Sequence, residues 1–263
     1  MSDLDDRWAL VTGGSSGLGV DIARKLADRG ASMILVARRE ERLEEVAAEL
    51  EDDHGVDADW ISMDLARRGA AKDLYDAVEQ KGYTVDVLVN NAGFGIYEEF
   101  LETEWSDQES MLDLDVRTPL HLTRLYGEEM VERGWGRILQ VASIGAYEPT
   151  PLYATYSASK ALLRNFSEAF DFELDGTGVS CTTVCPGVTR TEFFDSAGQD
   201  EVTLYQKLTM MKSENVASIA VRAMMQRRRL VVPGILNSLT MWSTRFMPRR
   251  LLTYVAYLTM RQG

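Results

Sequence analysis

The sequence predicts a single α/β domain with a doubly wound parallel sheet of about seven strands, helices on both faces and a C-terminal helical extension. Two observations predict this fold. Short apolar runs bounded by turn residues alternate with longer amphipathic segments, the pattern of parallel strands joined by helical crossovers. The 263 residues, 45% of them hydrophobic, suit one large domain, and no linker, repeat or low-complexity tract divides them.

Seven apolar runs are the expected strands. In chain order they are residues 8–14, 33–39, 59–65, 85–93, 136–143, 179–187 and 230–234. The helix after the first run is expected to end at Gly30, because glycine commonly follows the last helical residue. Residues 40–53 are rich in charge and predict a helix on the solvent side.

Cysteine and histidine are scarce. Cys181 and Cys185 are too few for a disulfide framework and are not spaced as CxxC, so we expect packed thiols in a reducing compartment. His54 and His121 have no ligand-like neighbour at metal spacing, and no metal site is expected.

The N-terminus and the charge narrow the cellular setting. Acidic residues stand where a signal peptide would need bases and an apolar run, and no stretch offers about 20 uninterrupted apolar residues. We therefore expect a cytoplasmic protein. Residues 212–263 carry a net +8, which leaves −21 for residues 1–211 out of a total of −13. An acidic body argues against nucleic acid as a partner.

A glycine-rich loop follows the first expected strand and opens a helix. It reads TGGSSGLG at residues 12–19, and Gly13, Gly17 and Gly19 permit a tight turn, close backbone approach and close helix packing. Free N–H groups at the helix N-terminus favour a phosphate. Glycines also occur in plain tight turns, but the position between strand and helix favours a Rossmann-type dinucleotide site. The residues expected to line it are Gly13, Ser15, Ser16, Gly17, Leu18 and Gly19.

The order of motifs resembles the short-chain dehydrogenase/reductase family. The loop has the form TGxxxGxG, and NNAG (90–93), Ser143, YSASK (156–160) and PGVTRT (186–191) follow in the order and at the intervals of that family. The stretches LVARREERL, VVPG and PRRLL are similar to an NADP-preferring subgroup of single-domain reductases. The resemblance covers nearly the whole chain. It implies an oxidoreductase that interconverts a carbonyl and an alcohol by hydride transfer.

The end of the second expected strand indicates which nucleotide is bound. An NAD-binding protein would place an acid there for the ribose 2′-hydroxyl, whereas this chain has Ala37 followed by Arg38 and Arg39. Arginine offers a bidentate fork for a 2′-phosphate, which favours NADP(H). Two observations count the other way. The arginines can pair with the two glutamates that follow them, and Ser16 stands where many NADP-binding relatives have a second basic residue.

The resemblance implies further contacts to the cofactor. Asp64 would contact adenine, and Asn91, Ala92 and Gly93 would line the adenosine ribose. Thr189 and Thr191, in the segment that begins with Pro186 and Gly187, would hold the nicotinamide carboxamide and a nearby phosphate.

The pentapeptide YSASK places Tyr156 and Lys160 at i and i+4 of a helix, on one face. An ordinary amphipathic turn would have the same spacing. With the resemblance, Tyr156 becomes the proton donor and acceptor, Lys160 also binds the nicotinamide ribose, and Ser143 orients the substrate oxygen. An ammonium about 4 Å away contributes about 4 kcal/mol at an effective dielectric near 20, so we expect Lys160, helped by the positive charge of the oxidised nicotinamide, to lower the pKa of Tyr156.

One member of the expected catalytic set departs from the family pattern. Asp115 stands where the family has an asparagine that supports a bend in its helix and a proton relay from the lysine. Aspartate lacks the amide donors and carries a charge when ionised. This departure leaves an alternative open, a catalytically impaired NADP(H)-binding regulatory or scaffold protein.

The last third of the chain predicts the substrate class and the partners. Residues 192–212 are expected to form an apolar flap over a lipophilic substrate, although the same residues could simply pack against the sheet. We expect residues 1–235 to form the catalytic domain and residues 236–263 an amphipathic extension. The extension can cap the site, contact another subunit or bind a membrane surface peripherally. Apolar positions on both sides of residues 161–174 indicate that this helix is covered twice, and the family resemblance then implies a homodimer or homotetramer.

Overall fold

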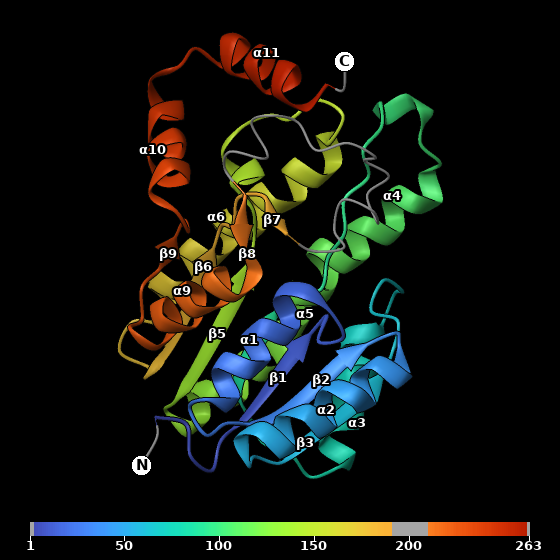
Figure 1. Ribbon diagram of the computed structural model, residues 1–263, viewed down its shortest axis with the longest axis vertical. Helices are drawn as coiled ribbons and strands as arrows, with labels where there is room; N and C mark the ends of the chain where they lie inside the picture. Colours follow the sequence, from blue (N-terminus) through green and yellow to red (C-terminus); the bar gives the residue numbers. More distant parts are fainter. Residues whose placement is uncertain (1–2, 191–209, 262–263) are drawn as a thin grey trace.

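The computed structural model describes residues 3–190 and 210–261. One parallel sheet of seven strands runs through it in the order β3-β2-β1-β4-β5-β6-β9 (Figure 1). Its strands are β1 (Trp8–Thr12), β2 (Ser32–Ala37), β3 (Ala58–Ser62), β4 (Val85–Asn90), β5 (Gly136–Val141), β6 (Val179–Val184) and β9 (Leu230–Val231). Each expected strand is therefore confirmed, with its end a few residues earlier than the apolar run suggests.

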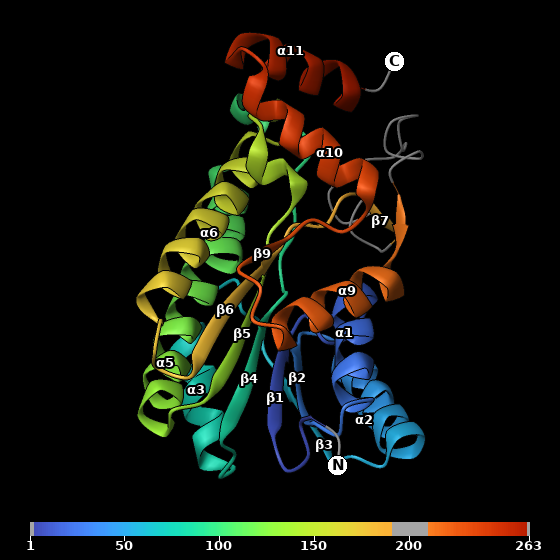
Figure 2. The same cartoon turned by 90° about the vertical axis from the view of Figure 1, so that its left-hand side faces the viewer.

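Helices cover both faces of this sheet. Figure 2 shows α1, α2 and α9 on one face and α3, α5 and α6 on the other. Their bounds are α1 (Gly17–Ala27), α2 (Glu40–His54), α3 (Ala70–Gln80), α5 (Thr118–Arg133), α6 (Ala154–Glu173) and α9 (Ser213–Met225). The doubly wound fold predicted from the alternation of apolar runs and amphipathic segments is thus confirmed.

The strands are apolar throughout because each of their faces meets a helical layer. In β2, Met33 and Leu35 point to the core beneath α1 and α2, whereas Ile34 and Val36 point to the core beneath α3 and α5. This alternation follows the two-residue period of a strand. Burial on both sides leaves the strand termini at the sheet edge as the place where polar groups can gather.

The strand order reverses between β2 and β4, which both pair with β1. In an open parallel sheet such a reversal opens a crevice beyond the carboxyl ends of the strands. The loops after β1, β2 and β4 all leave the sheet at that edge, which brings together sequence segments far apart in the chain.

A second, smaller sheet and the C-terminal extension lie above this edge. Strand β7 (Thr189–Arg190) pairs in parallel with β8 (Met211–Lys212), the last residues of the expected flap. Residues 192–209 of the flap lie outside the described residues. The extension forms α10 (Ile235–Ser243), the short 3-10 helix η4 (Thr244–Phe246) and α11 (Arg249–Met260). Among the described helices, none is both long and apolar enough to cross a membrane.

Candidate active site

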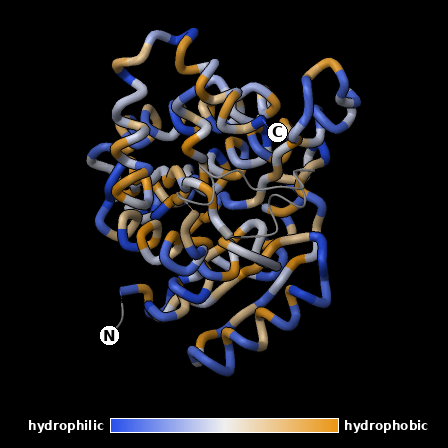
Figure 3. The backbone as a smooth tube through the Cα atoms, turned by 45° about the horizontal axis from the view of Figure 1, so that its top comes forward, coloured by the Kyte–Doolittle hydropathy of each residue, from blue (hydrophilic) through white to orange (hydrophobic). Residues whose placement is uncertain are grey.

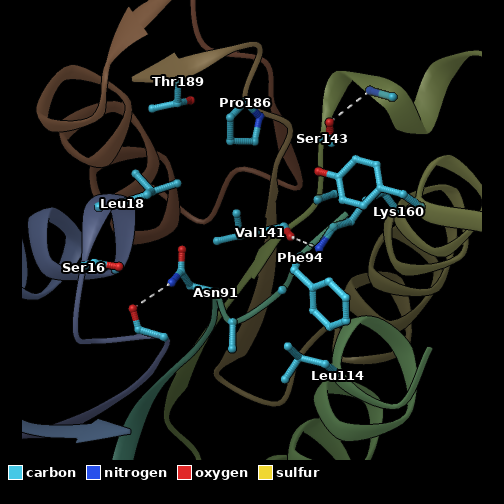
Figure 4. A pocket seen from close by; sticks show the side chains of 18 of the residues that line it. Ser16, Leu18, Asn91, Phe94, Leu114, Val141, Ser143, Lys160, Pro186 and Thr189 are labelled. Carbon is cyan, nitrogen blue, oxygen red and sulfur yellow. Dashed lines mark hydrogen bonds between the residues drawn. The ribbon is translucent and has the colours of Figure 1, made fainter. Parts of the chain in front are cut away.

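A cavity of about 740 Å³ opens at the carboxyl edge of the sheet (Figure 4). Its size falls in the range of cofactor and substrate pockets. Figure 4 shows Ser16 and Leu18 on one side of the cavity and Ser143, Lys160 and Phe94 on the other. The predicted residues that line it are Gly13, Ser15, Ser16, Gly17, Leu18, Gly19, Arg38, Arg39, Asp64, Asn91, Ala92, Gly93, Ser143, Tyr156, Lys160, Pro186, Gly187 and Thr189.

The glycine-rich loop joins β1 to α1 and needs its glycines for two different reasons. Gly13 and Gly17 have φ angles of +69° and +54°, a region that favours glycine. At Gly19 the reason is space, since a Cβ atom there would lie 2.1 Å from the carbonyl oxygen of Gly13. Helix α1 therefore begins directly against the loop, with its N-terminal N–H groups at the cavity.

The loop after β4 is fastened to the glycine-rich loop. The side-chain amide of Asn91 donates to the carbonyl oxygen of Thr12 at 2.9 Å, and the Thr12 hydroxyl accepts from the backbone N–H groups of Asn91 and Ala92 at 3.0 Å each. The same hydroxyl donates to the carbonyl oxygen of Val89 at 3.2 Å. These bonds fix the two walls of the crevice relative to each other.

Two arginines stand where β2 ends and α2 begins. Arg38 and Arg39 are exposed at the rim of the cavity, and the Arg39 guanidinium lies 3.5 Å from the hydroxyl oxygen of Ser15 in the glycine-rich loop. Asp64, at the end of the next strand, accepts from the backbone N–H of Ala66 at 3.0 Å. The positive charge thus lies beside the loop that the helix N-terminus already makes favourable for phosphate.

Ser143 and Tyr156 meet on the opposite wall. Ser143 precedes the 3-10 helix η3 (Ile144–Tyr147), and its hydroxyl accepts from the backbone N–H of Gly145 at 3.1 Å. Tyr156, in the first turns of α6, forms a side-chain hydrogen bond with Ser143. One turn further along α6, the Lys160 ammonium lies 5.6 Å from the centroid of the Tyr156 ring. The structure therefore brings the three predicted catalytic residues together.

Asp115 lies behind Lys160 rather than in the cavity wall. Its carboxylate is 3.2 Å from the Lys160 ammonium and accepts from the backbone N–H of Phe94 at 3.2 Å and from the Ser159 hydroxyl at 3.2 Å. Lys160 also donates to the carbonyl oxygen of Val141 at 3.4 Å. Burial raises the pKa of Asp115, and the ammonium of Lys160 acts in the opposite direction.

A single π-turn positions the Asp115 side chain next to Lys160 and its other hydrogen-bond partners. Helix α4 (Trp105–Leu112) continues into α5 through η2 (Asp113–Arg117), whose hydrogen bonds span one residue more than those of an α-helix. The chain also makes room on the other side. At Gly93 a Cβ atom would lie 2.7 Å from the Asp115 carboxylate and 2.9 Å from the Lys160 ammonium. The sequence suggested the bend at Asp115, but not that Gly93 is required for it.

The expected effect of Lys160 on Tyr156 is not what the structure shows. Burial raises the pKa of Tyr156 above that of a free tyrosine, and the negative charge of Asp115 raises it further. The lowered pKa was expected for the complex with oxidised nicotinamide, and it stays a prediction for that complex; in the protein without cofactor, burial first and the Asp115 charge second act in the opposite direction. Tyr156 therefore holds its proton firmly in this state.

Sequence reasoning missed three residues at the substrate end of the cavity. Tyr153 is buried with its ring centroid 5.7 Å from that of Tyr156, and its place three residues earlier on the same helix face could have revealed it. Glu148 is half-buried, and burial raises its pKa. Met260 comes from the last turn of α11, and no local pattern predicts its arrival here. Thr191, a predicted cofactor contact, lies outside the described residues.

The comparison with known proteins places the chain in a family. A model of the family described as short chain dehydrogenase matches residues 7–202. The chain belongs to the short-chain dehydrogenase family. The match spans the glycine-rich loop and the Ser143, Tyr156 and Lys160 set, so the family resemblance inferred from the motifs is confirmed.

Two relatives and one solved structure show how far the likeness to other short-chain dehydrogenases extends. An uncharacterized oxidoreductase of Staphylococcus epidermidis is 30% identical over 226 residues, 86% of this chain and 94% of the relative. Sulfoacetaldehyde reductase 2 of Chromohalobacter salexigens is 34% identical over 227 residues, 83% of this chain and 87% of the relative. A short-chain dehydrogenase from Sphingobium yanoikuyae in complex with NADPH superposes with a TM-score of 0.81 at 25% identity, covering 92% of this chain and 97% of that one.

Proposed function

We propose that this protein is an NADPH-dependent carbonyl reductase that acts on lipophilic carbonyl compounds and works in reverse on the corresponding alcohols. One observation carries the proposal. The cavity that holds Ser143, Tyr156 and Lys160 extends to the glycine-rich loop, with Arg38 and Arg39 at its far rim. A dinucleotide whose phosphates meet α1 would then present its nicotinamide to the tyrosine.

The described residues fit an NADP(H) molecule. The backbone at Gly13, Gly17 and Gly19 leaves a cradle that a single Cβ atom would fill or distort. Arg38 and Arg39 supply planar donors for a 2′-phosphate. Among the described residues, Arg38 forms no ion pair with a carboxylate, which weighs against the alternative that this arginine serves only its neighbouring glutamates. The NADPH in the Sphingobium structure supports the same cofactor class.

The residues of the site divide the chemistry between them. When bound, the reduced nicotinamide supplies a hydride to the carbonyl carbon of the substrate. Tyr156 donates its phenolic proton to the carbonyl oxygen, which completes the alcohol, and Ser143 donates a hydrogen bond that polarises and orients that oxygen. Lys160 then returns a proton to the tyrosinate and takes up a replacement from solvent in the open cavity, while Asp115 holds the lysine side chain in place. In the reverse direction Tyr156 accepts the proton of the alcohol.

The ion pair behind Tyr156 favours reduction. A tyrosine with a raised pKa is protonated over the physiological range and is ready to act as an acid. Oxidation of an alcohol needs the tyrosinate instead. We infer that reduction proceeds at neutral pH and that oxidation requires an alkaline pH.

The substrate end of the cavity is mostly apolar. Its described lining there includes Phe94, Ile144, Tyr153, Val188 and Met260. The cations among the described lining residues are Arg38, Arg39 and Lys160, which the proposal assigns to the cofactor. Among the described lining residues, an anionic substrate such as the sulfoacetaldehyde named for one relative would find Glu148 but no cation outside the three given to the cofactor. That relative still supports carbonyl reduction as the reaction class.

A fluorescence titration with NADPH and, separately, with NADH tests the cofactor part of the proposal. We expect NADPH to bind at least about tenfold more tightly, the size of one charge-assisted contact. Equal binding would remove the role of the arginines. A screen of bulky hydrophobic ketones against small charged aldehydes, followed by NADPH consumption, then tests the substrate class, and turnover confined to the charged aldehydes would contradict it.

A further inference from the structure

The two C-terminal helices expose apolar side chains along one stripe each. On α11 the stripe is Leu251, Tyr254, Val255 and Leu258, with exposed fractions of 49%, 60%, 39% and 53%. The spacing i, i+3, i+4, i+7 is that of one helix face. Leu252 and Ala256, which point to the body of the protein, are buried. Helix α11 therefore has one apolar face that packs and a second that does not pack on the described chain.

Helix α10 repeats the arrangement. Four of its exposed side chains are apolar, one of them a large aromatic ring, and the other two are serines, whereas its inward positions Asn237 and Met241 are buried. We call the outward residues of α10, η4 and α11 the terminal apolar surface. It consists of Ile235, Leu236, Leu239, Trp242, Phe246, Leu251, Tyr254, Val255 and Leu258. The tube through this end of the molecule changes repeatedly between hydrophobic and hydrophilic colours (Figure 3).

The charge of this segment is opposite to that of the body. Residues 235–263 contain four arginines, Arg245, Arg249, Arg250 and Arg261, and no acidic residue. The rest of the chain must then carry −17 out of the total of −13. All four arginines are exposed, and none of them forms an ion pair within the described part of the chain. An exposed apolar stripe flanked by arginines is the composition of a helix that lies in a membrane interface.

The terminal apolar surface adjoins the mouth of the cavity. Met260 lines the cavity, and its carbonyl oxygen accepts a hydrogen bond from the Tyr97 hydroxyl at 2.8 Å. The chain that follows Tyr97 exposes Phe100, Leu101 and Trp105 by 48%, 88% and 60%. Apolar side chains from two distant parts of the sequence are thus exposed within a few residues of the contact between Tyr97 and Met260.

We propose that the terminal apolar surface docks this protein on an anionic lipid bilayer, with α10 and α11 lying in the interface. The arginines meet the lipid headgroups and the apolar stripes enter the acyl boundary. The entrance of the cavity then faces the bilayer, so a lipophilic substrate would reach Tyr156 without crossing water. This last consequence rests on the proposed function, whereas the docking itself does not.

A second copy of the chain is a weaker occupant of the same surface. A symmetric dimer pairs the same patch on both subunits, so it would bring four arginines against four arginines with no acid between them. Helix α6 offers a different exposed apolar pair, Leu162 and Phe172, for contact between subunits. Charge complementarity therefore favours the anionic membrane.

Vesicle flotation of the full-length protein tests the proposal without any substrate. We expect the protein to float with vesicles of phosphatidylcholine and phosphatidylserine and to stay behind with phosphatidylcholine alone. Changing Leu251→Ser together with Leu258→Ser, or Arg249→Glu together with Arg250→Glu, should reduce the bound fraction more than about tenfold. These side chains are exposed, so circular dichroism should show an unchanged fold.

Two control variants make the result specific to this surface. Arg42→Glu with Arg124→Glu changes the net charge equally but lies on α2 and α5, and Phe172→Ser removes an exposed ring from α6. Both should float like the original protein.

The proposal is overturned if the original protein does not float with vesicles that contain phosphatidylserine. It is also overturned if the two terminal variants float as well as the original protein. If the original protein does not float and light scattering shows a smaller oligomer for the Leu251→Ser, Leu258→Ser variant, then a second copy of the chain covers the surface instead. NADPH binding is measured separately, so failure to float leaves the cofactor proposal standing.

Discussion

The carboxylate of Asp115 lies 3.2 Å from the ammonium nitrogen of Lys160, and both side chains are buried. The pair joins the π-turn between α4 and α5 to the first turns of α6, directly behind Tyr156. A lysine paired with a carboxylate exerts less positive potential on its surroundings than a lysine alone. This chain therefore has a different electrostatic setting around Tyr156 from one with a neutral asparagine at that position.

Asp115→Asn should move the pH dependence of alcohol oxidation toward lower pH. The negative charge of Asp115 disfavours the tyrosinate and so raises the pKa of Tyr156. Removing that charge lowers this pKa, and the tyrosinate forms at lower pH. We expect the midpoint of the oxidation profile to fall by about one pH unit, with little change in reduction at neutral pH.

The matched control is Asp113→Asn. Asp113 is on the same π-turn and is also buried, but it pairs with Arg117 rather than with Lys160. The control should keep the original midpoint. An identical profile for all three proteins, each shown to be folded, would remove Asp115 from the tuning of Tyr156.

Tyr156→Phe should lower kcat by a factor of about 10² to 10⁴ in both directions, because it removes the group that donates and accepts the proton. The ring remains, so the dissociation constant for NADPH should change by no more than a few-fold. Steady-state rates and a fluorescence titration measure the two effects. Tyr147→Phe is the control, a half-buried tyrosine on η3 that packs against Arg164 outside the cavity. Full turnover by the Tyr156 variant would exclude it as the acid.

Arg38→Ala should weaken the binding of NADPH by about tenfold or more and leave the binding of NADH nearly unchanged. The reason is that only NADPH carries the 2′-phosphate that the guanidinium would hold. Arg42→Ala, on the exposed side of α2 and paired with Glu45, should alter neither affinity. Equal losses for both nucleotides in Arg38→Ala would mean that the side chain shapes the pocket rather than recognising the phosphate.

Gly19→Ala should abolish cofactor binding and lower the free energy of unfolding. The new methyl group would stand 2.1 Å from the carbonyl oxygen of Gly13, so the glycine-rich loop and α1 must separate. We expect a loss of about 1–3 kcal/mol, the range of overpacked sites. Gly127→Ala is the control in α5, where the added Cβ meets nothing closer than 3.5 Å and helix propensity should improve by up to about 1 kcal/mol. Denaturant unfolding and NADPH titration separate the two variants, and normal binding by Gly19→Ala would contradict the role given to this contact.

The sequence alone was sufficient for the sheet, the glycine-rich loop and the Tyr156 and Lys160 pair. All three depend on local information. Strands buried on both faces are apolar runs, helix termini follow glycines, and an i, i+4 pair needs only a helix to share a face. The residues that were predicted to bind the cofactor, where they are described, all face one cavity. They do so because the carboxyl ends of parallel strands meet at one edge of the sheet.

Only the tertiary structure decided the state of the tyrosine and the outer limits of the site. The sequence has Asp115 forty-five residues before Lys160, and whether they form an ion pair depends on the space left by Gly93 and on the π-turn. Burial raises the pKa of Tyr156 in the protein without cofactor, because desolvation depends on neighbours from every element around it. The path of the chain after β9 decides two further features. It brings Met260 to the cavity, and it leaves the apolar stripes of α10 and α11 exposed. A periodic apolar pattern in the sequence indicates that a helix has an apolar face, but it does not indicate which surface covers that face.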